Sequence, residues 1–137
     1  MLEKRFYFST RLDRSSEATP LLEALKGQGW ERTYVWSDQT LSPDKSSDIA
    51  TAELEGIRLA NVVVVLLPGG YGTHAEIGAA LALGKPVILH SPDHNTLNTP
   101  YPCVFHYHPL IHLIVSEVVD VETLIGQMTA EIESRSV

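Results

Sequence analysis

Apolar and polar residues alternate in two different patterns along this chain, one typical of strands and one typical of helices. Short apolar or aromatic runs predict strands at residues 5–9, 33–36, 62–67 and 87–90. Between these runs apolar residues recur every three or four positions, and this spacing predicts helices over residues 20–27, 46–60, 74–83 and 121–133. The run that begins at Val62 holds four consecutive valines, which is typical of a strand buried on both faces.

The ends and faces of these elements carry further signals. Pro20 fits the first turn of its helix, and Gly84 ends the helix over residues 74–83. In the second helix, the residues predicted to face inward are Ile49, Ala52, Leu54 and Ile57. The last strand has two candidates, the segments 103–105 and 112–115.

Strands that alternate with helices predict parallel pairing through right-handed crossovers. The predicted fold is therefore an α/β, three-layer, Rossmann-like or flavodoxin-like domain, with a parallel sheet of about five strands and helices on both faces. A chain of 137 residues is predicted to form a single domain, 1–137. Ligands of such sheets bind beyond the carboxyl ends of the strands. The segments of interest are therefore 9–11, 36–38, 68–76 and 90–93.

Composition excludes several classes of protein. A net charge of −7 opposes binding to a nucleic-acid polymer, which requires a basic surface. The longest apolar run, 62–67, is too short to span a membrane. The single cysteine, Cys103, cannot form an internal disulfide, and the first residues lack the pattern of a signal peptide. We expect a cytoplasmic protein in which Cys103 is a small buried apolar side chain.

A glycine-rich turn lies between the valine-rich strand and the next predicted helix. Its glycines are predicted to take positive φ and to let a ligand approach the backbone, while the helix start offers free N–H groups to an anion. The spacing matches neither the dinucleotide fingerprint nor the P-loop. Arg11, after the first strand, is either a partner for a bound phosphate or a solvated surface cation. The turn consists of Pro68, Gly69, Gly70, Tyr71, Gly72 and Thr73.

A purely structural interpretation of this turn is equally open. Thr73 and Glu76 have the spacing of a capping box, in which Glu76 would bond the Thr73 backbone instead of facing a ligand. Trp36 lies at the carboxyl end of the second predicted strand, where its indole either stacks on a base or belongs to the core or an interface. The histidines at 106, 108 and 112 lack acidic or cysteine ligands at matching spacing, so we predict neither a metal site nor a cofactor.

Two families resemble this sequence. Residues 68–76 are similar to the P-G-G-x-G-T-x-x-E signature of the phosphoribohydrolases that release cytokinin bases, once classed as lysine decarboxylases. The opening Phe6-Tyr7-Phe8-Ser9 and the segment 76–80 resemble the nucleoside 2-deoxyribosyltransferase family, which includes deoxynucleotide N-hydrolases. The resemblance extends over residues 5–89. It implies an enzyme that cleaves the N-glycosidic bond of a nucleoside or a nucleoside 5′-monophosphate, by hydrolysis or by transfer.

The resemblance also implies roles for particular residues. Glu76 takes the place of the nucleophilic glutamate, and Tyr7 that of the tyrosine that holds it. Glu53 stands where the deoxyribosyltransferases carry a shorter aspartate, and Gly70 where relatives often carry Asp or Ser. These two departures leave a non-catalytic nucleotide or nucleotide-sugar sensor as the alternative. Substrate contacts are expected at Ser9, Thr10, Arg11, Trp36 and residues 68–73, in a homodimer or a larger homo-oligomer.

Overall fold

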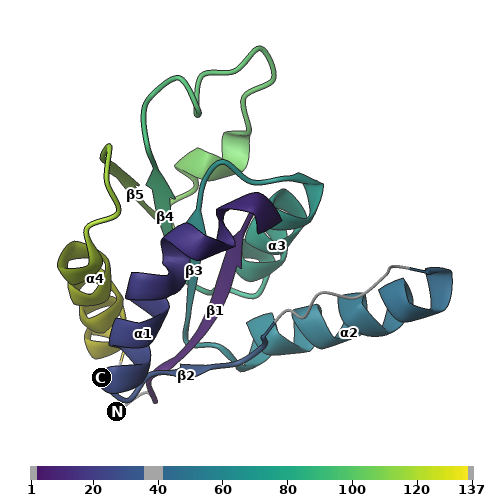
Figure 1. The fold of residues 1–137 in the computed structure, drawn as a ribbon, viewed down its shortest axis with the longest axis horizontal. Helices are drawn as coiled ribbons and strands as arrows, with labels where there is room; N and C mark the ends of the chain where they lie inside the picture. Colours follow the sequence, from purple (N-terminus) through teal and green to yellow (C-terminus); the bar gives the residue numbers. More distant parts are fainter. Residues whose placement is uncertain (1–2, 36–41, 136–137) are drawn as a thin grey trace.

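A computed structural model describes residues 3–35 and 42–135 of the chain. Five parallel strands form one sheet in the order β2-β1-β3-β4-β5 (Figure 1), as the alternating pattern predicted. The strands are β1 (Arg5–Thr10), β2 (Glu31–Arg32), β3 (Val62–Leu66), β4 (Val87–Ser91) and β5 (Ile111–Val115). The α-helices are α1 (Thr19–Gly27), α2 (Pro43–Leu59), α3 (Tyr71–Ala82) and α4 (Val121–Ser134). Two 3₁₀ helices complete the described elements, η1 (Leu12–Ala18) and η2 (Val104–Tyr107).

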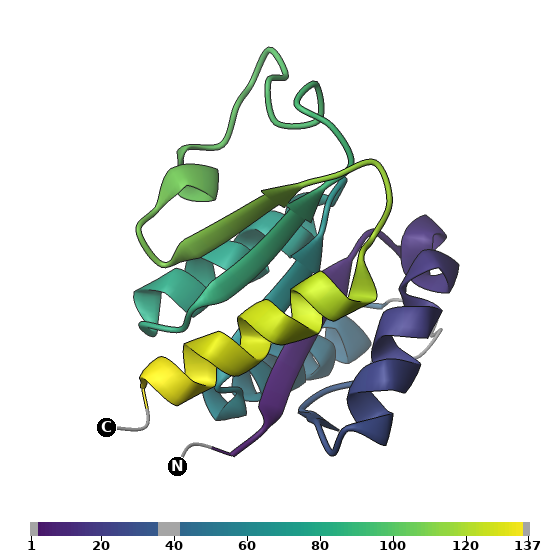
Figure 2. The same cartoon turned by 90° about the vertical axis from the view of Figure 1, so that its left-hand side faces the viewer.

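Helices cover both faces of the sheet, so the molecule has three layers. Helices α1 and α4 lie on one face, and α2 and α3 lie on the other (Figure 2). Every residue of β3 is buried, as the valine run predicted. Since side chains alternate along a strand, Val64 packs toward α1 and α4, whereas Val63 and Val65 pack toward α2 and α3.

Two predictions about the strands are corrected or decided by the structure. The fifth strand is Ile111–Val115, whereas the residues after Cys103 enter η2. The second strand is shorter and earlier than residues 33–36. Just beyond its end, the hydroxyl of Thr33 donates a 2.7 Å hydrogen bond to the carbonyl of Gly56 on α2. Trp36 lies outside the described residues.

The second helix differs from its sequence prediction at both its start and its buried face. It begins at Pro43, and the side chain of Ser42 caps it by accepting a bond from the Lys45 N–H. Ile57 is buried as predicted, but Ala52 is exposed and the side chain of Leu54 is 52% exposed. The face of α2 that packs on the molecule carries Ile49, Glu53, Gly56 and Ile57, and Ala52 and Leu54 lie to either side of this face. The first turns of α2 project beyond the sheet (Figure 1).

The strand order fixes where a ligand can bind. After β1 the chain runs to α1 on one face of the sheet, and after β3 it runs to α3 on the other. Such a switch point opens a crevice at the carboxyl ends of the two neighbouring strands. The ends are level, because Thr10 pairs with Leu66. Within the described residues, no helix is long and apolar enough to cross a membrane.

Candidate active site

The glycine-rich turn joins β3 to α3 in a conformation that differs from the predicted one. Among the described residues, positive φ occurs only at Gly29 and Gly84, so no glycine of the turn adopts it. The turn needs Gly69 for a different reason. A Cβ on Gly69 would lie 2.4 Å from Cγ2 of Thr73, a distance that the buried Thr73 side chain excludes. The peptide bond between Leu67 and Pro68 is cis.

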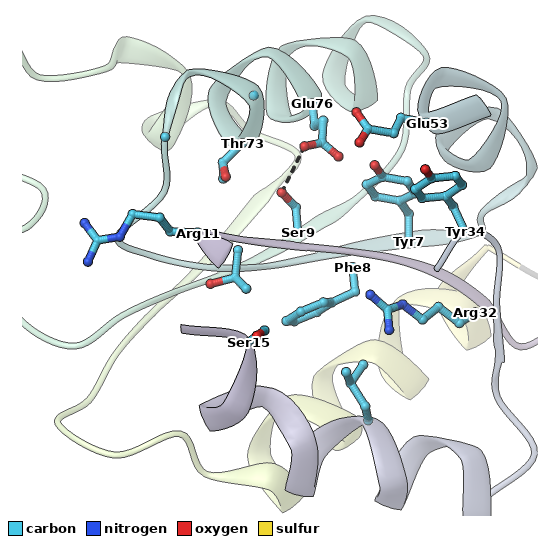
Figure 3. A pocket seen from close by; sticks show the side chains of 14 residues that line it. Tyr7, Phe8, Ser9, Arg11, Ser15, Arg32, Tyr34, Glu53, Thr73 and Glu76 are labelled. Carbon is cyan, nitrogen blue, oxygen red and sulfur yellow. Dashed lines mark hydrogen bonds between the residues drawn. The ribbon is translucent and has the colours of Figure 1, made fainter. Parts of the chain in front are cut away.

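The start of α3 excludes the capping box. Gly70 is the N-cap, so Thr73 lies inside the first turn and cannot cap the helix. Glu76 instead points toward β1, where its Oε1 accepts a hydrogen bond of 3.2 Å from the Ser9 hydroxyl (Figure 3). The carboxylate of Glu76 is therefore presented to the switch-point crevice.

A cavity of about 550 Å³ occupies this crevice. The predicted residues Tyr7, Glu53 and Glu76 all line it, although they come from β1, α2 and α3. Glu53 and Glu76 lie near each other above the hydroxyls of Tyr7 and Tyr34 (Figure 3). The other lining residues are Phe8, Ser9, Thr10, Arg11, Ser15, Leu22, Arg32, Gly70, Gly72 and Thr73.

Three residues of the predicted turn do not line this cavity. Pro68 and Gly69 border a second hollow behind the turn, and Tyr71 is 99% exposed. Arg11 reaches the cavity, but its guanidinium is paired with Asp13 at 2.6 Å and is exposed. The turn therefore faces the cavity through Gly70, Gly72 and the side chain of Thr73.

The electrostatics of the cavity centre on Glu76. The pKa of this carboxyl is raised from 4.5 to about 7, mainly by burial and to a smaller extent by the nearby charge of Glu53. Hydrogen bonds from Tyr7 and Ser9 favour the ionised form and lower the pKa, but burial outweighs them. Burial also raises the pKa of Glu53. The site therefore holds two acidic groups that lose their protons less readily than exposed glutamates do.

Tyr7 is held as a neutral hydrogen-bond donor. Burial, followed by the charge of Glu76, raises the pKa of its phenol far above the usual value. The Tyr34 ring stacks on the Tyr7 ring with centroids 6.4 Å apart. The ring of Tyr7 and the Cβ of Tyr34 lie against Gly56 of α2, where an added Cβ would come within 2.9 Å of the Tyr34 Cβ. The absence of a side chain at Gly56 therefore lets α2 bring Glu53 close to the tyrosine pair.

The sequence analysis missed several residues of the cavity, above all Tyr34 and Arg32. Arg32 places its guanidinium 5.4 Å from the centre of the Phe8 ring, and its buried Nε has no hydrogen-bond partner among the described residues. Tyr34 lies in the segment 33–36 that was predicted to be a strand, and of that segment only Trp36 was considered as a substrate contact. The signal that could have found both residues is their position at the carboxyl end of an edge strand, where Arg32 is the last residue of β2 and Tyr34 follows two positions later.

The histidines that were considered together in the sequence, at 106, 108 and 112, do not form a cluster. Nδ1 of His108 accepts a bond from the Leu110 N–H, and His112 is exposed on β5. His106 lies instead beside His74 and Cys103, with ligand atoms that are all within 4.8 Å of one another. Cys103 is half-buried, so it is not the buried apolar side chain that was predicted.

Comparison with known protein families identifies the family of this chain. Residues 6–134 match the family model of the nucleoside 2-deoxyribosyltransferases. Because the match spans nearly the whole sequence, the chain belongs to this family of enzymes. Among curated proteins, none matches it.

Solved structures share the fold at low sequence identity. A CMP N-glycosidase from Clostridium botulinum is 19% identical, with a TM-score of 0.62 and coverage of 92% of this chain and 99% of the other. A 2-deoxyribosyltransferase from Bacillus psychrosaccharolyticus is 20% identical, with a TM-score of 0.60 and coverage of 88% and 95%. A conserved protein from Enterococcus faecalis is 20% identical, with a TM-score of 0.67 and coverage of 94% and 99%.

Proposed function

We propose that this protein cleaves the N-glycosidic bond of a nucleoside or a nucleoside 5′-monophosphate, with Glu76 as the nucleophile. The observation that carries the proposal is the position of Glu76. Its carboxylate accepts a hydrogen bond from Ser9 and faces the 550 Å³ cavity at the switch point. Membership of the nucleoside 2-deoxyribosyltransferase family supports the same chemistry. Two of the solved structures that share the fold of this protein are a CMP N-glycosidase and a 2-deoxyribosyltransferase.

The reaction proceeds in two steps. An oxygen of the ionised Glu76 attacks the anomeric carbon of the sugar as the bond from that carbon to the base nitrogen breaks. Glu53, protonated, gives its proton to the departing base, so the base leaves neutral. Water then attacks the glycosyl-enzyme ester and completes a hydrolysis, or a second base attacks it and completes a transfer. Glu53, now ionised, takes up the proton that the attacking water or base loses. In either case Glu76 is released as a carboxylate.

Tyr7 and Ser9 position the nucleophile. Both donate to Glu76 and favour its ionised form, which is the form that attacks. Tyr7 itself is buried and keeps its proton, so it remains a donor across the physiological pH range. The stacked Tyr34 holds the Tyr7 ring in this orientation.

The polar groups of the cavity are compatible with a 5′-phosphate on the substrate. Gly70 and Gly72 line the cavity at the start of α3, where free backbone N–H groups and the helix dipole favour an anion. Arg32 lies with Phe8 on the other side of β1 from Glu76 (Figure 3), and Arg11 is already paired with Asp13, so these N–H groups are the donors for the phosphate. A nucleoside 5′-monophosphate therefore gives partners to more of the hydrogen-bond donors in the cavity than a nucleoside does. The homo-oligomer implied by the resemblance stays a prediction.

A substrate panel tests this function. Nucleosides and their 5′-monophosphates are incubated with the protein, with and without an acceptor base, and free base is followed by chromatography. We expect base release, and a loss of about a thousandfold in Glu76→Ala and Glu76→Gln. Glu23→Gln, an exposed glutamate on α1, is the matched control. Undiminished turnover in both Glu76 variants would refute the nucleophile. Tight nucleotide binding without base release by the wild type would favour the sensor alternative.

A further inference from the structure

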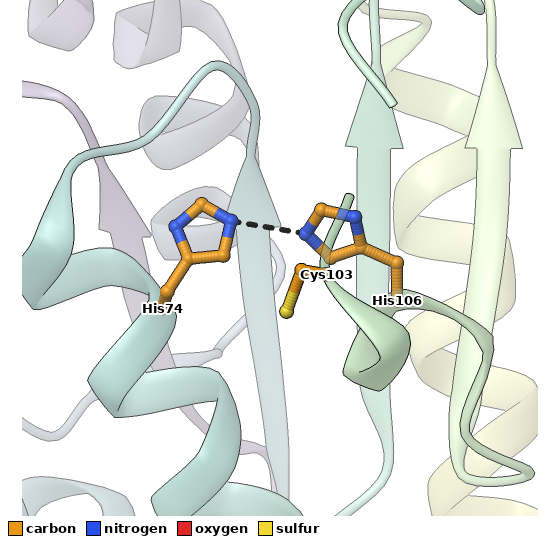
Figure 4. Close-up of side chains that lie close together, drawn as sticks. All are labelled: His74, Cys103 and His106. Carbon is orange, nitrogen blue, oxygen red and sulfur yellow. Dashed lines mark hydrogen bonds between the residues drawn. The ribbon is translucent and has the colours of Figure 1, made fainter. Parts of the chain in front are cut away.

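We propose that His74, Cys103 and His106 form a binding site for a divalent transition-metal ion, with Zn²⁺ as the best match. The three residues come from the first turn of α3 and from the connection between β4 and β5. One ligand atom of each lies within 4.8 Å of the other two. Figure 4 shows the Cys103 side chain next to the two facing imidazole rings. None of the three lines the catalytic cavity.

The orientation of His74 is that of a metal ligand. Its Nδ1 lies 2.9 Å from the carbonyl oxygen of Gly70, and only a protonated nitrogen can donate to a carbonyl. The proton therefore sits on Nδ1, and the lone pair of Nε2 points into the cluster. A backbone carbonyl that fixes the tautomer in this way is the usual outer partner of a metal-bound histidine.

The orientation of His106 points to the same place. This side chain is only 4% exposed, and its Nε2 lies 3.0 Å from Nε2 of His74. Its Nδ1 has no hydrogen-bond partner among the described residues. The single polar contact that orients this buried ring is therefore the one directed at His74 and the centre of the cluster.

The distances require only a small adjustment to hold a metal. Tetrahedral Zn²⁺ with ordinary bond lengths sets its two nitrogens about 3.3 Å apart and a sulfur about 3.6 Å from each nitrogen. The two nitrogens are already 3.0 Å apart. The sulfur can approach, because Cys103 is half-buried at the start of the short η2 helix.

The ligand set selects the kind of ion. Two imidazoles and a thiolate suit Zn²⁺ and similar transition metals, whereas Ca²⁺ and Mg²⁺ require oxygen ligands. Binding releases the thiol proton of Cys103, and the proton on Nε2 of His106 moves to Nδ1 of the same ring. Three protein ligands leave the fourth tetrahedral position for water.

A metal bound at this site would stabilise the connection 92–110, which has few buried side chains to hold it against the rest of the protein. In the connection 92–110, only Leu97 and His106 are buried. A bound metal would tie this connection to the first turn of α3, on the side of the glycine-rich turn opposite the catalytic cavity. We therefore expect the metal to stabilise the loop rather than to take part in the reaction.

Metal titration of the full chain tests the proposal. Purified protein is freed of metal with a chelator and then titrated with Co²⁺, and separately with Zn²⁺. We expect one Co²⁺ per chain, with the near-ultraviolet absorption of a thiolate–cobalt bond, and displacement of Co²⁺ by Zn²⁺. Cys103→Ser removes the absorption and weakens binding by more than about 100-fold, because the loss of even an outer partner costs about 10- to 100-fold. Histidine 112 is exposed on β5, so His112→Gln is the control and binds as the wild type does.

Proteolysis provides a second measurement that does not depend on absorption. Zn²⁺ should protect the connection 92–110 of the wild type from cleavage, but not that of Cys103→Ser. Equal metal affinity in the wild type and Cys103→Ser would overturn the proposal, since it would indicate binding to surface histidines. The absence of stoichiometric binding to the wild type would overturn it as well.

Discussion

The hydroxyl of Ser9 donates a hydrogen bond of 3.2 Å to Oε1 of Glu76, and this bond joins β1 to α3 across the switch point of the sheet. The two residues are 67 positions apart in the sequence. Their contact turns Glu76 away from the end of its own helix and toward the cavity. Both the proposed reaction and its dependence on pH follow from this arrangement.

The rate of base release is expected to rise and then fall with pH, because attack needs an ionised Glu76 and departure of the base needs a protonated Glu53. The pKa of Glu76 is raised to about 7, and the attacking form is the carboxylate, so kcat/KM should fall about tenfold per unit well below that pH. Ser9→Ala and Tyr7→Phe each remove a donor to the ionised form. Both should therefore shift the rising limb of the profile to higher pH, with the larger shift for Tyr7→Phe. Profiles are recorded with a chelator present, so that no metal at His74 contributes.

The control for this profile is Ser134→Ala, since that hydroxyl bonds the Glu131 carbonyl on α4, far from the cavity. The midpoint of its rising limb should equal that of the wild type. A Ser9→Ala profile that coincides with the wild-type profile would mean that the Ser9 hydroxyl does not act on Glu76.

Glu76→Gln should stabilise the protein at alkaline pH. The pKa of Glu76 is about 7 in the folded state and about 4.5 in the unfolded state, so the folded state holds the proton more tightly. Stability is therefore lost as pH rises from 4.5 to 7, by up to about 3 kcal/mol. The neutral amide avoids this loss. Thermal unfolding should show a gain for Glu76→Gln at pH 8 that disappears near pH 4.5, and Glu23→Gln on the surface should show no such gain.

Gly56→Ala is expected to disturb both stability and the site. The added Cβ would lie 2.9 Å from the Cβ of Tyr34 and 3.1 Å from the Tyr7 ring, so the tyrosine pair must move. Overpacking of this kind costs about 1–3 kcal/mol, which exceeds the gain of about 1 kcal/mol from replacing a helical glycine. Urea unfolding and kcat/KM should both decrease. Gly126→Ala on α4 meets no atom within 4 Å and should be neutral or stabilising.

Gly70→Ser tests whether a side chain at this position can hold the substrate. A Cβ on Gly70 meets no described atom within 4 Å, and its φ of −97° suits any residue, so the change carries no strain. The hydroxyl would enter the cavity beside the free N–H groups of α3 and add a donor for the phosphate or the sugar. We expect KM to fall several-fold in Gly70→Ser but not in Gly70→Ala. An equal change in the two variants would show that the hydroxyl makes no contact with the substrate.

Local patterns in the sequence were enough to determine the class of fold. Alternating apolar runs and helical spacings predicted the parallel sheet, because burial of a strand or a helix face is recorded in the periodicity of its own residues. The same argument placed β3 at the centre of the sheet, and family resemblance brought Tyr7, Glu53 and Glu76 together as one candidate site. Residues whose burial depends on a distant neighbour were not predictable in this way, as the exposed Leu54 on α2 shows.

Only the tertiary structure decided which way the side chains of the site face. From the sequence, Glu76 was equally compatible with a capping box and with a ligand site, because both depend on where α3 begins. The packing of Thr73 against Gly69 and the bond from Ser9 decide the question. The cluster of His74, Cys103 and His106 likewise exists only because the β4–β5 connection folds back onto α3. Contacts of this kind join segments far apart in the chain, and local spacing carries no record of them.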